Sequence, residues 1–403
     1  ANSPRCSTRS LHRAEPRRPS SAARMALWGV VALLIGYGSL YPFRFRFPGL
    51  PLESLLQVPP LWTRPSDVFG NMLLFVPWSL CGWWAGRGTA WRRAAPVLLG
   101  GLAWALLLQV LQLWLPERVA SLGDVFWNAL GLAAGLLLAT RLHDAPRTAC
   151  IAILALWLLG LLLPLLPFWP AGLPLAWVRS LQATLSLPLP AALVWHVAGG
   201  WLSMRLLQGL GAGVRAAVGL VVGVLLLGPA LPAAHPDPAQ MLGLPLGVLC
   251  ALYGRERADG LLIGLIAAVY TFDGLWPFRW RPLGMLSLQP FDSLLHGNML
   301  NNLRHLCARL AIYAGVLWLI QQRCQRLPPL ATLLVVGWVV GVEGAQAWLV
   351  GRYADIGELF WVLLAAGLVH LAGPLHPVAG AAPVSGPHGL DPLASTAGRS
   401  GEG

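Results

Sequence analysis

Four polar residues in the C-terminal part of the chain could do chemistry together. Glu343 and Gln346 stand three residues apart inside an apolar stretch, and Arg352 and Glu358 follow at intervals of six residues. A charged group at the centre of a membrane helix costs at least about 2.5–3.5 kcal/mol. Glu343 must therefore pair, take up a proton or line a wet cavity. Residues three apart share a helix face, and a short loop between two antiparallel helices would bring all four groups together.

The same spacing occurs once more, earlier in the chain. Gln109, Gln112, Arg118 and Asp124 are separated by 3, 6 and 6 residues, as are the four residues above. Asn128 follows Asp124 at the i+4 position, so both share one helix face. Carboxylates at a helix N-terminus are stabilised by the helix dipole, which suits both Asp124 and Glu358.

Two further matches accompany these groups in the same order. Residues 37–46 read YGSLYPFRFR and residues 272–281 read FDGLWPFRWR, while Gly-Asn-Met-Leu occurs at 70–73 and at 297–300. Three matches in one order predict an internal duplication. The alternating Arg and aromatic residues predict either anchoring at a membrane interface or a clamp for anionic headgroups.

The elements that position these residues are predicted from composition. The chain has 403 residues, of which 56% are hydrophobic and only 11% charged. Soluble domains are about 25% charged, so this chain has too little polar surface to coat a soluble globule. The net charge of +12 lies in short loops, which excludes a basic nucleic-acid-binding face.

Apolar stretches long enough for membrane helices recur along the chain. They cover residues 25–43, 68–86, 95–115, 122–140, 149–169, 190–208, 213–233, 240–253, 258–276, 298–320, 328–350 and 357–373. The expected fold is an all-α polytopic membrane bundle of about twelve transmembrane helices, with ten as the lower bound because some stretches are short or interrupted by Arg.

The predicted domains follow from the duplication. A first unit (25–142) and a second unit (258–373) each contain four helices, and an intervening unit (143–257) is interpreted as a possible degenerate third copy. Residues 1–24 are interpreted as a disordered basic tail or as sequence ahead of a start at Met25, and residues 374–403 as a disordered tail. The distribution of Arg predicts a multi-pass protein of the inner (plasma) membrane with both termini in the cytoplasm.

At this point the residues resemble a known family, the VanZ-like membrane domain. The resemblance rests on an Asp-x-x-x-Asn helix start with a following Phe and Pro, and on Glu-x-x-Gln followed by Arg, Asp, Asn and Gly. In the first unit the matching residues are Asp67, Asn71, Phe75, Pro77, Gln112, Arg118, Asp124, Asn128 and Gly131. In the second unit they are Asn298, Glu343, Gln346, Arg352 and Glu358.

Each unit departs from the pattern. Gln109 stands where the pattern has Glu, Val362 stands where Asn128 would repeat, and Leu294 stands opposite Asp67. Either the two units complement one another in one site or one of them is decaying. The named member of the family is associated with resistance to the glycopeptide teicoplanin, so the resemblance implies a location and a class of phenotype rather than a reaction.

The expected function is a polar site near the extracytoplasmic face that binds or handles a cell-envelope component. The alternatives are a transporter with parallel repeat halves, an intramembrane enzyme acting on a lipid-linked substrate, and residues that only stabilise the fold. The predicted site residues are Arg46, Asp67, Asn71, Gln112, Arg118, Asp124, Asn128, Arg281, Asn298, Glu343, Gln346, Arg352 and Glu358.

The expected partners are membrane lipids and a lipid-linked or anionic envelope component, with no nucleic acid. The six Cys show no CxxC spacing, and the chain has no P-loop, GxSxG, HExxH or GxGxxG motif. The sequence therefore predicts no cofactor, metal or catalytic residue, and favours a non-enzymatic protein while leaving activity open.

Overall fold

The structure is a computed structural model of the chain. It describes residues 20–57, 65–141, 145–163, 190–228, 231, 238–254, 258–295 and 299–375. The predicted tail at 374–403 lies almost wholly outside these ranges, as does most of the predicted tail at 1–24.

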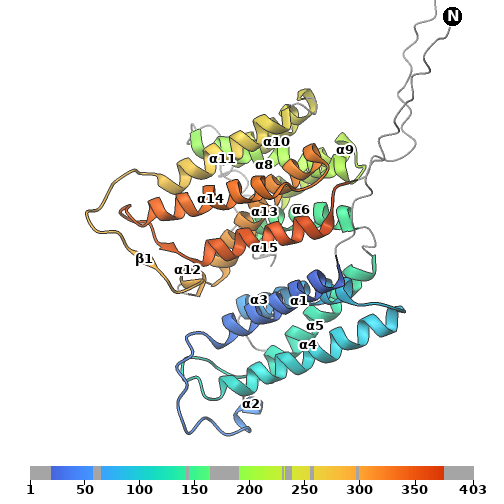
Figure 1. Ribbon diagram of the computed structural model, residues 1–403, viewed down its shortest axis with the longest axis vertical. Coiled ribbons are helices and arrows are strands. Elements are labelled where there is room, and N and C mark those ends of the chain that lie inside the picture. The colour runs from blue at the N-terminus through green and yellow to red at the C-terminus, as the bar shows by residue number, and fades with distance from the viewer. Residues whose placement is uncertain are drawn as a thin grey trace, which may run out of the picture.

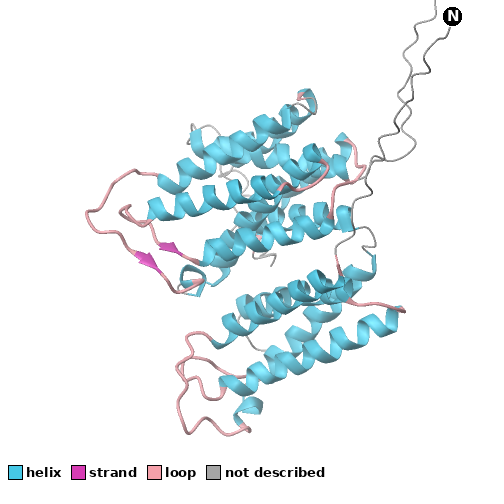
Figure 2. Cartoon of the chain, in the orientation of Figure 1, coloured by secondary structure: helices cyan, strands magenta, loops and turns pink. Residues whose placement is uncertain are grey.

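Most of the described chain is helical (Figure 2). Its helices are α1 (Ser21–Leu40), α2 (Ser54–Gln57), α3 (Pro65–Ala85), α4 (Ala90–Gln112), α5 (Leu122–Arg141), α6 (Ala145–Leu162), α8 (Pro190–Gly209), α9 (Val214–Leu227), α10 (Pro238–Tyr253), α11 (Asp259–Leu275), α12 (Asp292–Leu295), α13 (Met299–Cys324), α14 (Pro329–Gln346) and α15 (Gly357–Ala372). The strands are β1 (Leu286–Ser287) and β2 (Ala354–Asp355), which pair in parallel.

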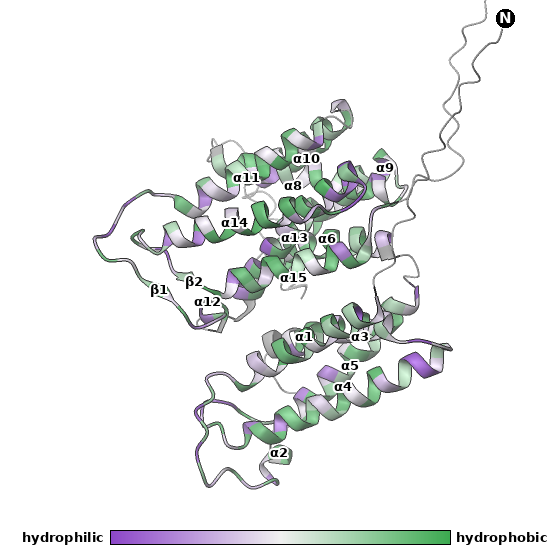
Figure 3. Cartoon of the chain, viewed as in Figure 1, coloured by the Kyte–Doolittle hydropathy of each residue, from purple (hydrophilic) through white to green (hydrophobic). Residues whose placement is uncertain are grey.

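The predicted all-α membrane bundle is confirmed. Each of the twelve apolar stretches overlaps one helix, and within the part of the chain that the structure describes six helices are long and apolar enough to cross a membrane. Four others are apolar but shorter, at 10–17 residues, so the count of twelve crossings stays a prediction. Helices suit this environment because every backbone polar group inside a bilayer must bond within the protein. Apolar residues dominate the helices throughout (Figure 3).

The first helix begins earlier than the sequence predicted. Its first residue is Ser21, four residues ahead of Met25, and the Ser20 side chain accepts a hydrogen bond from the Ala23 N–H at 3.2 Å. Serine is a favoured N-cap residue, and the Arg24 guanidinium donates to the Trp84 carbonyl on α3. Residues 20–24 therefore belong to the first unit.

The helices gather into two bodies, α1–α5 and α6–α15 (Figure 1). The first body has its own core around Leu27, Val31, Phe75 and Leu132. In the second body a single core joins residues of α6 and α8 to residues of α11, α13, α14 and α15. The intervening and second units thus share one core.

Glycines allow two helix pairs to pack closely. A Cβ atom on Gly131 or Gly135 of α5 would collide with backbone carbonyls of α3. Likewise, a Cβ on Gly243 or Gly247 of α10 would collide with backbone of α8. Small residues four apart are a common way to bring membrane helices together. The second and fourth helices of the first and intervening units therefore pack alike, while the third copy stays a prediction.

The short elements gather at one end of the bundle, which we call the loop-rich end. It carries α2, α12, β1 and β2, while α1 begins and α15 ends at the opposite end (Figure 1). The Arg distribution predicts that the loop-rich end is extracytoplasmic. Arg118 and Arg352, from the spacing of polar residues that occurs twice in the sequence, lie in loops at this same end.

Candidate functional site

In the first unit, three helices bring polar side chains together around Asp124. The Asn71 amide donates to Asp124 Oδ1 at 2.9 Å, and the Gln109 amide donates to Oδ2 at 3.3 Å. Gln109 Oε1 accepts from the Ser121 N–H at 2.9 Å, and the Ser121 hydroxyl accepts from the Gly123 N–H at 3.0 Å. Asp124 lies in the first turn of α5, where the helix dipole favours a carboxylate.

Arg118 binds backbone carbonyls. The spacing in the sequence had predicted that it would lie beside a carboxylate. Its Nε donates to the Tyr41 carbonyl and its Nη2 to the Gly38 carbonyl, both at 3.0 Å. The Gln112 amide donates to the Ser39 carbonyl at 2.9 Å. The last carbonyls of a helix have no partner within it, and these two side chains satisfy three of them. Burial lowers the pKa of Arg118, which still stays far above neutral pH.

The second unit places Arg352 in the same way. Its guanidinium donates to the Trp276 carbonyl at 2.9 Å and to the Asp273 carbonyl, both at the end of α11. Buried Gln346 lies against Gly274, where an added Cβ would meet its amide nitrogen at 3.0 Å. Arg352 therefore holds the end of α11 as Arg118 holds the end of α1.

The carboxylates of the second unit meet different partners. Glu343 accepts a hydrogen bond from the Asp355 backbone N–H and interacts with Glu358 and Arg309. Glu358 accepts from Arg309 and from the Tyr313 hydroxyl, which lies 2.6 Å from the Tyr270 hydroxyl. The result is a buried chain of polar groups that crosses from α11 through α13 to α15.

Sequence reasoning missed Arg309, Tyr270 and Tyr313. Arg309 interrupts an apolar stretch, and Tyr313 follows it at i+4 on the same face. This spacing was a signal that a polar face points inward. The partner could not be found from the sequence because Glu358 lies 49 residues away from Arg309.

The two units share a set of matching backbone contacts. The Arg46 N–H donates to the Trp114 carbonyl and the Arg281 N–H to the Trp348 carbonyl, both at 2.8 Å. Phe43 and Phe278 both adopt a left-handed conformation, with φ of 60° and 59°. These residues, matched from the sequence, thus make the same backbone contacts in the two units, while the duplication itself stays a prediction.

The loop arginines have different surroundings. The Arg281 Nε donates to the Ala347 carbonyl at 2.9 Å, which ties its loop to the end of α14. Arg46 is exposed. Arg44 pairs with Glu117 at 3.3 Å, and both side chains are at least half exposed, so this pair adds little stability.

The remaining predicted residues fall into two groups. Asn128 is buried on α5, and its side-chain oxygen has no hydrogen-bond partner among the described residues. Asp67 lies in α3, but its side chain is outside the described part of the chain, and Asn298 lies outside the described residues altogether.

A second polar cluster joins the two bodies at the loop-rich end. Asp292 accepts hydrogen bonds from Tyr41 at 3.5 Å, from Ser287 at 3.0 Å and from Tyr353. Burial, and then the charge of Asp292, raise the pKa of Tyr41.

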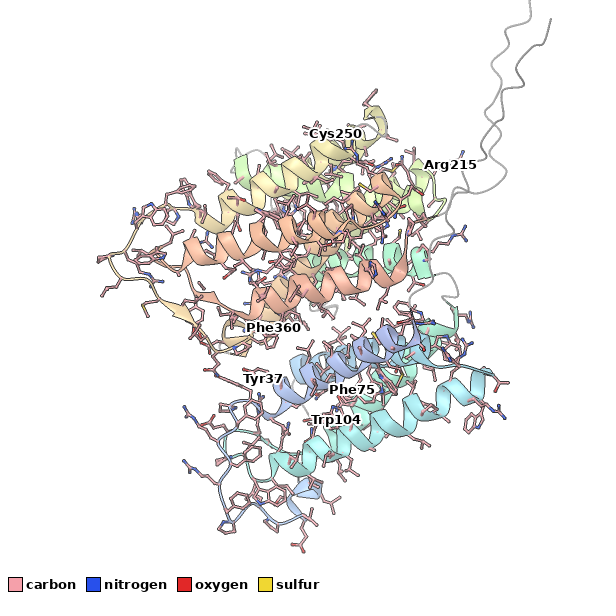
Figure 4. All side chains as sticks on the ribbon, in the orientation of Figure 1. Tyr37, Phe75, Trp104, Arg215, Cys250 and Phe360 are labelled. Atoms are coloured by element: carbon pink, nitrogen blue, oxygen red, sulfur yellow. The ribbon has the colours of Figure 1, made fainter. Side chains whose placement is uncertain are left out.

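Aromatic contacts accompany this polar link. Tyr37 packs against Phe291 at 5.4 Å, and Phe291 packs against Phe360 at 5.5 Å. The labelled side chains of Tyr37 and Phe360 mark the facing edges of the two bodies (Figure 4).

Comparison with known proteins identifies one family. Residues 20–143 match the family model described as VanZ/LLP1. This range corresponds to α1–α5, the body predicted as the first unit. No curated protein and no solved structure matches the chain.

Proposed function

We propose that this membrane protein binds an anionic, amphiphilic component of the cell envelope at its loop-rich end. The proposal starts from its VanZ-like domain at residues 20–143. The observation that carries this proposal is a pair of exposed loops rich in Arg and aromatic residues, held alike in both units. We call them the Arg–aromatic loops, at residues 42–50 and 277–285.

The Arg–aromatic loops combine cationic and apolar exposed groups. Arg44, Arg46 and Arg279 are exposed. Phe47 is 81% exposed and Trp280 is 62% exposed. Guanidinium groups suit phosphate or carboxylate, and aromatic side chains favour the interface between headgroups and acyl chains. An amphiphile with an anionic headgroup satisfies both requirements.

The buried polar residues hold these loops in position. Arg118 and Arg352 fix the helix ends from which the loops leave. Arg281, at the centre of the second loop, ties that loop to the end of α14. In this proposal Arg118, Arg352 and Arg281 are positioning residues, and the exposed arginines contact the ligand. A rigid binding surface limits the entropy lost on binding.

Native mass spectrometry of the full chain in nanodiscs tests the proposal. The probes are phosphatidylglycerol and undecaprenyl phosphate, each competed against phosphatidylcholine. The triple variant R44A/R46A/R279A should lose at least about tenfold in affinity for the anionic probes, because hydrogen bonds to charged groups are worth about 1.5–3 kcal/mol.

The opposite end of the bundle offers a matched control. Arg87, Arg92 and Arg141 are also exposed, and Trp91 beside them is 73% exposed. The R87A/R92A/R141A variant removes the same charge and should keep the affinity. Equal losses of affinity in the two triple variants would show unspecific charge attraction and would overturn the proposal.

The link to teicoplanin resistance and the inner-membrane location rest on the family resemblance and the Arg distribution. Growth assays with teicoplanin, comparing the native chain and the R44A/R46A/R279A variant, test the first. Flux of a probe in proteoliposomes would instead favour the transporter, and turnover of a lipid-linked probe would favour the enzyme.

A further inference from the structure

Gln109 and Glu343 occupy the same place in their two units. Gln109 accepts from the backbone N–H of Ser121 at 2.9 Å, and Glu343 accepts from the backbone N–H of Asp355. Ser121 and Asp355 also match. The Ser121 hydroxyl accepts from the Gly123 N–H at 3.0 Å, and the Asp355 carboxylate accepts from the Gly357 N–H at 2.6 Å. The backbone around the two side chains is therefore arranged alike.

The second half of the contact differs between the units. The amide N–H of Gln109 donates to Asp124. In the second unit the matching acceptor is Glu358. An ionised Glu343 has no hydrogen to donate, whereas a protonated Glu343 has one O–H and is then a close copy of the Gln109 amide.

Charge balance favours the protonated form. Glu343 and Glu358 are only 6% and 5% exposed. Arg309 pairs with Glu358, which also accepts from Tyr313. These two donors together satisfy the Glu358 carboxylate. A second ionised carboxylate beside it would add an unpaired buried charge, which costs several kcal/mol.

A polar face of α13 connects this site to the loop-rich end. Asn301, His305, Arg309 and Tyr313 follow one another at intervals of four residues, so they share one face. Asn301 and His305 are exposed, the Arg309 side chain is 37% exposed, and Tyr313 is fully buried.

The direction of this face follows from two contacts between α13 and α15. Arg309 meets Glu358, and the Gln321 amide donates to the Val369 carbonyl at 2.8 Å, so the helices run parallel. The first ten residues of α13 therefore extend beyond Glu358 toward the loop-rich end, by about 15 Å at 1.5 Å per residue.

We propose that the second unit holds an exchangeable proton on Glu343, donated in a hydrogen bond to Glu358 and exchanged with solvent along the polar face of α13. The first unit carries the same geometry with a permanent amide, so it binds no such proton. Protonation transfers one proton from hydronium to a Glu343 carboxylate oxygen and leaves water.

The groups that face Glu343 come from four elements. They are Tyr270 from α11, Arg309 from α13, Asp355 from β2 and Glu358 from α15. Tyr313, also on α13, bonds to Glu358. This proposal concerns the proton alone and does not depend on which envelope component binds the loops.

Infrared spectroscopy of the full chain in nanodiscs tests the inference without any lipid ligand. A protonated carboxyl gives a C=O stretch that shifts on deuteration. The native chain should show this band near neutral pH, where exposed carboxyls are ionised, and lose it at alkaline pH. The Glu343→Gln variant should fold with an unchanged Tm and lose the band. A band that persists in this variant, or a variant that fails to fold, would overturn the proposal.

The first unit supplies the reciprocal experiment. The Gln109→Glu variant places a carboxyl against Asp124 in the matching geometry and should add a second band of comparable area. If no second band forms near neutral pH, where exposed carboxyls are ionised, the equivalence of the two positions, and with it the proposal, is contradicted.

Discussion

The first and second units hold their loops with the same contacts but place different groups around their acceptor carboxylates. Arg118 and Arg352 each bind the final carbonyls of a preceding helix. Asp124, in contrast, meets two neutral amides, whereas Glu358 meets a guanidinium and a tyrosine hydroxyl. The contacts that hold the loops are common to both units, and the second unit buries an ion pair between Arg309 and Glu358.

The largest effect should come from removing the cation of the second unit. Arg309→Ala leaves Glu358 buried without its ion-pair partner, which should lower the free energy of unfolding by about 3 kcal/mol, allowing for the partial exposure of Arg309. Thermal unfolding in detergent measures the effect. Arg44→Ala, which breaks the exposed pair with Glu117, should change the stability by less than about 1 kcal/mol. Similar losses in both variants would remove the distinction between the units.

A smaller loss of stability should follow when a larger side chain replaces a glycine at a helix–helix contact. Gly131→Val and Gly247→Val each force a side chain against the backbone of the adjacent helix, and overpacking costs about 1–3 kcal/mol. Thermal unfolding should show similar losses in the two variants if α3–α5 and α8–α10 are equivalent pairs. Gly219, which has open space around its Cβ position, provides the control as Gly219→Val. A large loss in α5 with none in α10 would argue against a third copy.

The shared loop contacts should respond equally in both units. Arg118→Ala and Arg352→Ala each remove two hydrogen bonds from a charged donor, so each should cost about 1.5–3 kcal/mol. Lys at either position should not restore the loss because it cannot make the planar two-bond contact. Proteolysis of the Arg–aromatic loops, compared between variants, would report whether each loop is released. Release in only one unit would break the proposed equivalence.

The smallest effect concerns the link between the two bodies. Tyr41→Phe removes one hydroxyl from Asp292 and should cost about 1 kcal/mol. Because the pKa of Tyr41 is raised in the folded protein, this contribution is fully present below pH of about 10, the unfolded value. It is lost as pH rises through the higher folded pKa. Melting temperatures of the native chain and the variant should therefore converge at strongly alkaline pH, and divergence there would contradict the assignment.

Much of the fold could be predicted because membrane helices are specified locally. Each apolar stretch overlaps a helix in the described part of the chain, and Gln109, Gln112, Arg118 and Asp124 lie where α4 ends and α5 begins. The start of α1 was predicted late because Ala22 and Ala23 are not part of an obvious apolar block, although Ser20 is a good N-cap.

The sequence by itself determined the helices and the spacing of the polar groups, since apolar length and helical periodicity act over a few turns. Only the tertiary structure decided the partners. It paired Arg309 with Glu358, directed Arg118 to the end of α1, and brought Tyr41 to Asp292 across 251 residues of chain. The physical reason is that a buried polar group must bond to polar groups of the adjacent helix at the same level of the bundle. Which helices are adjacent is set by the packing of the whole bundle.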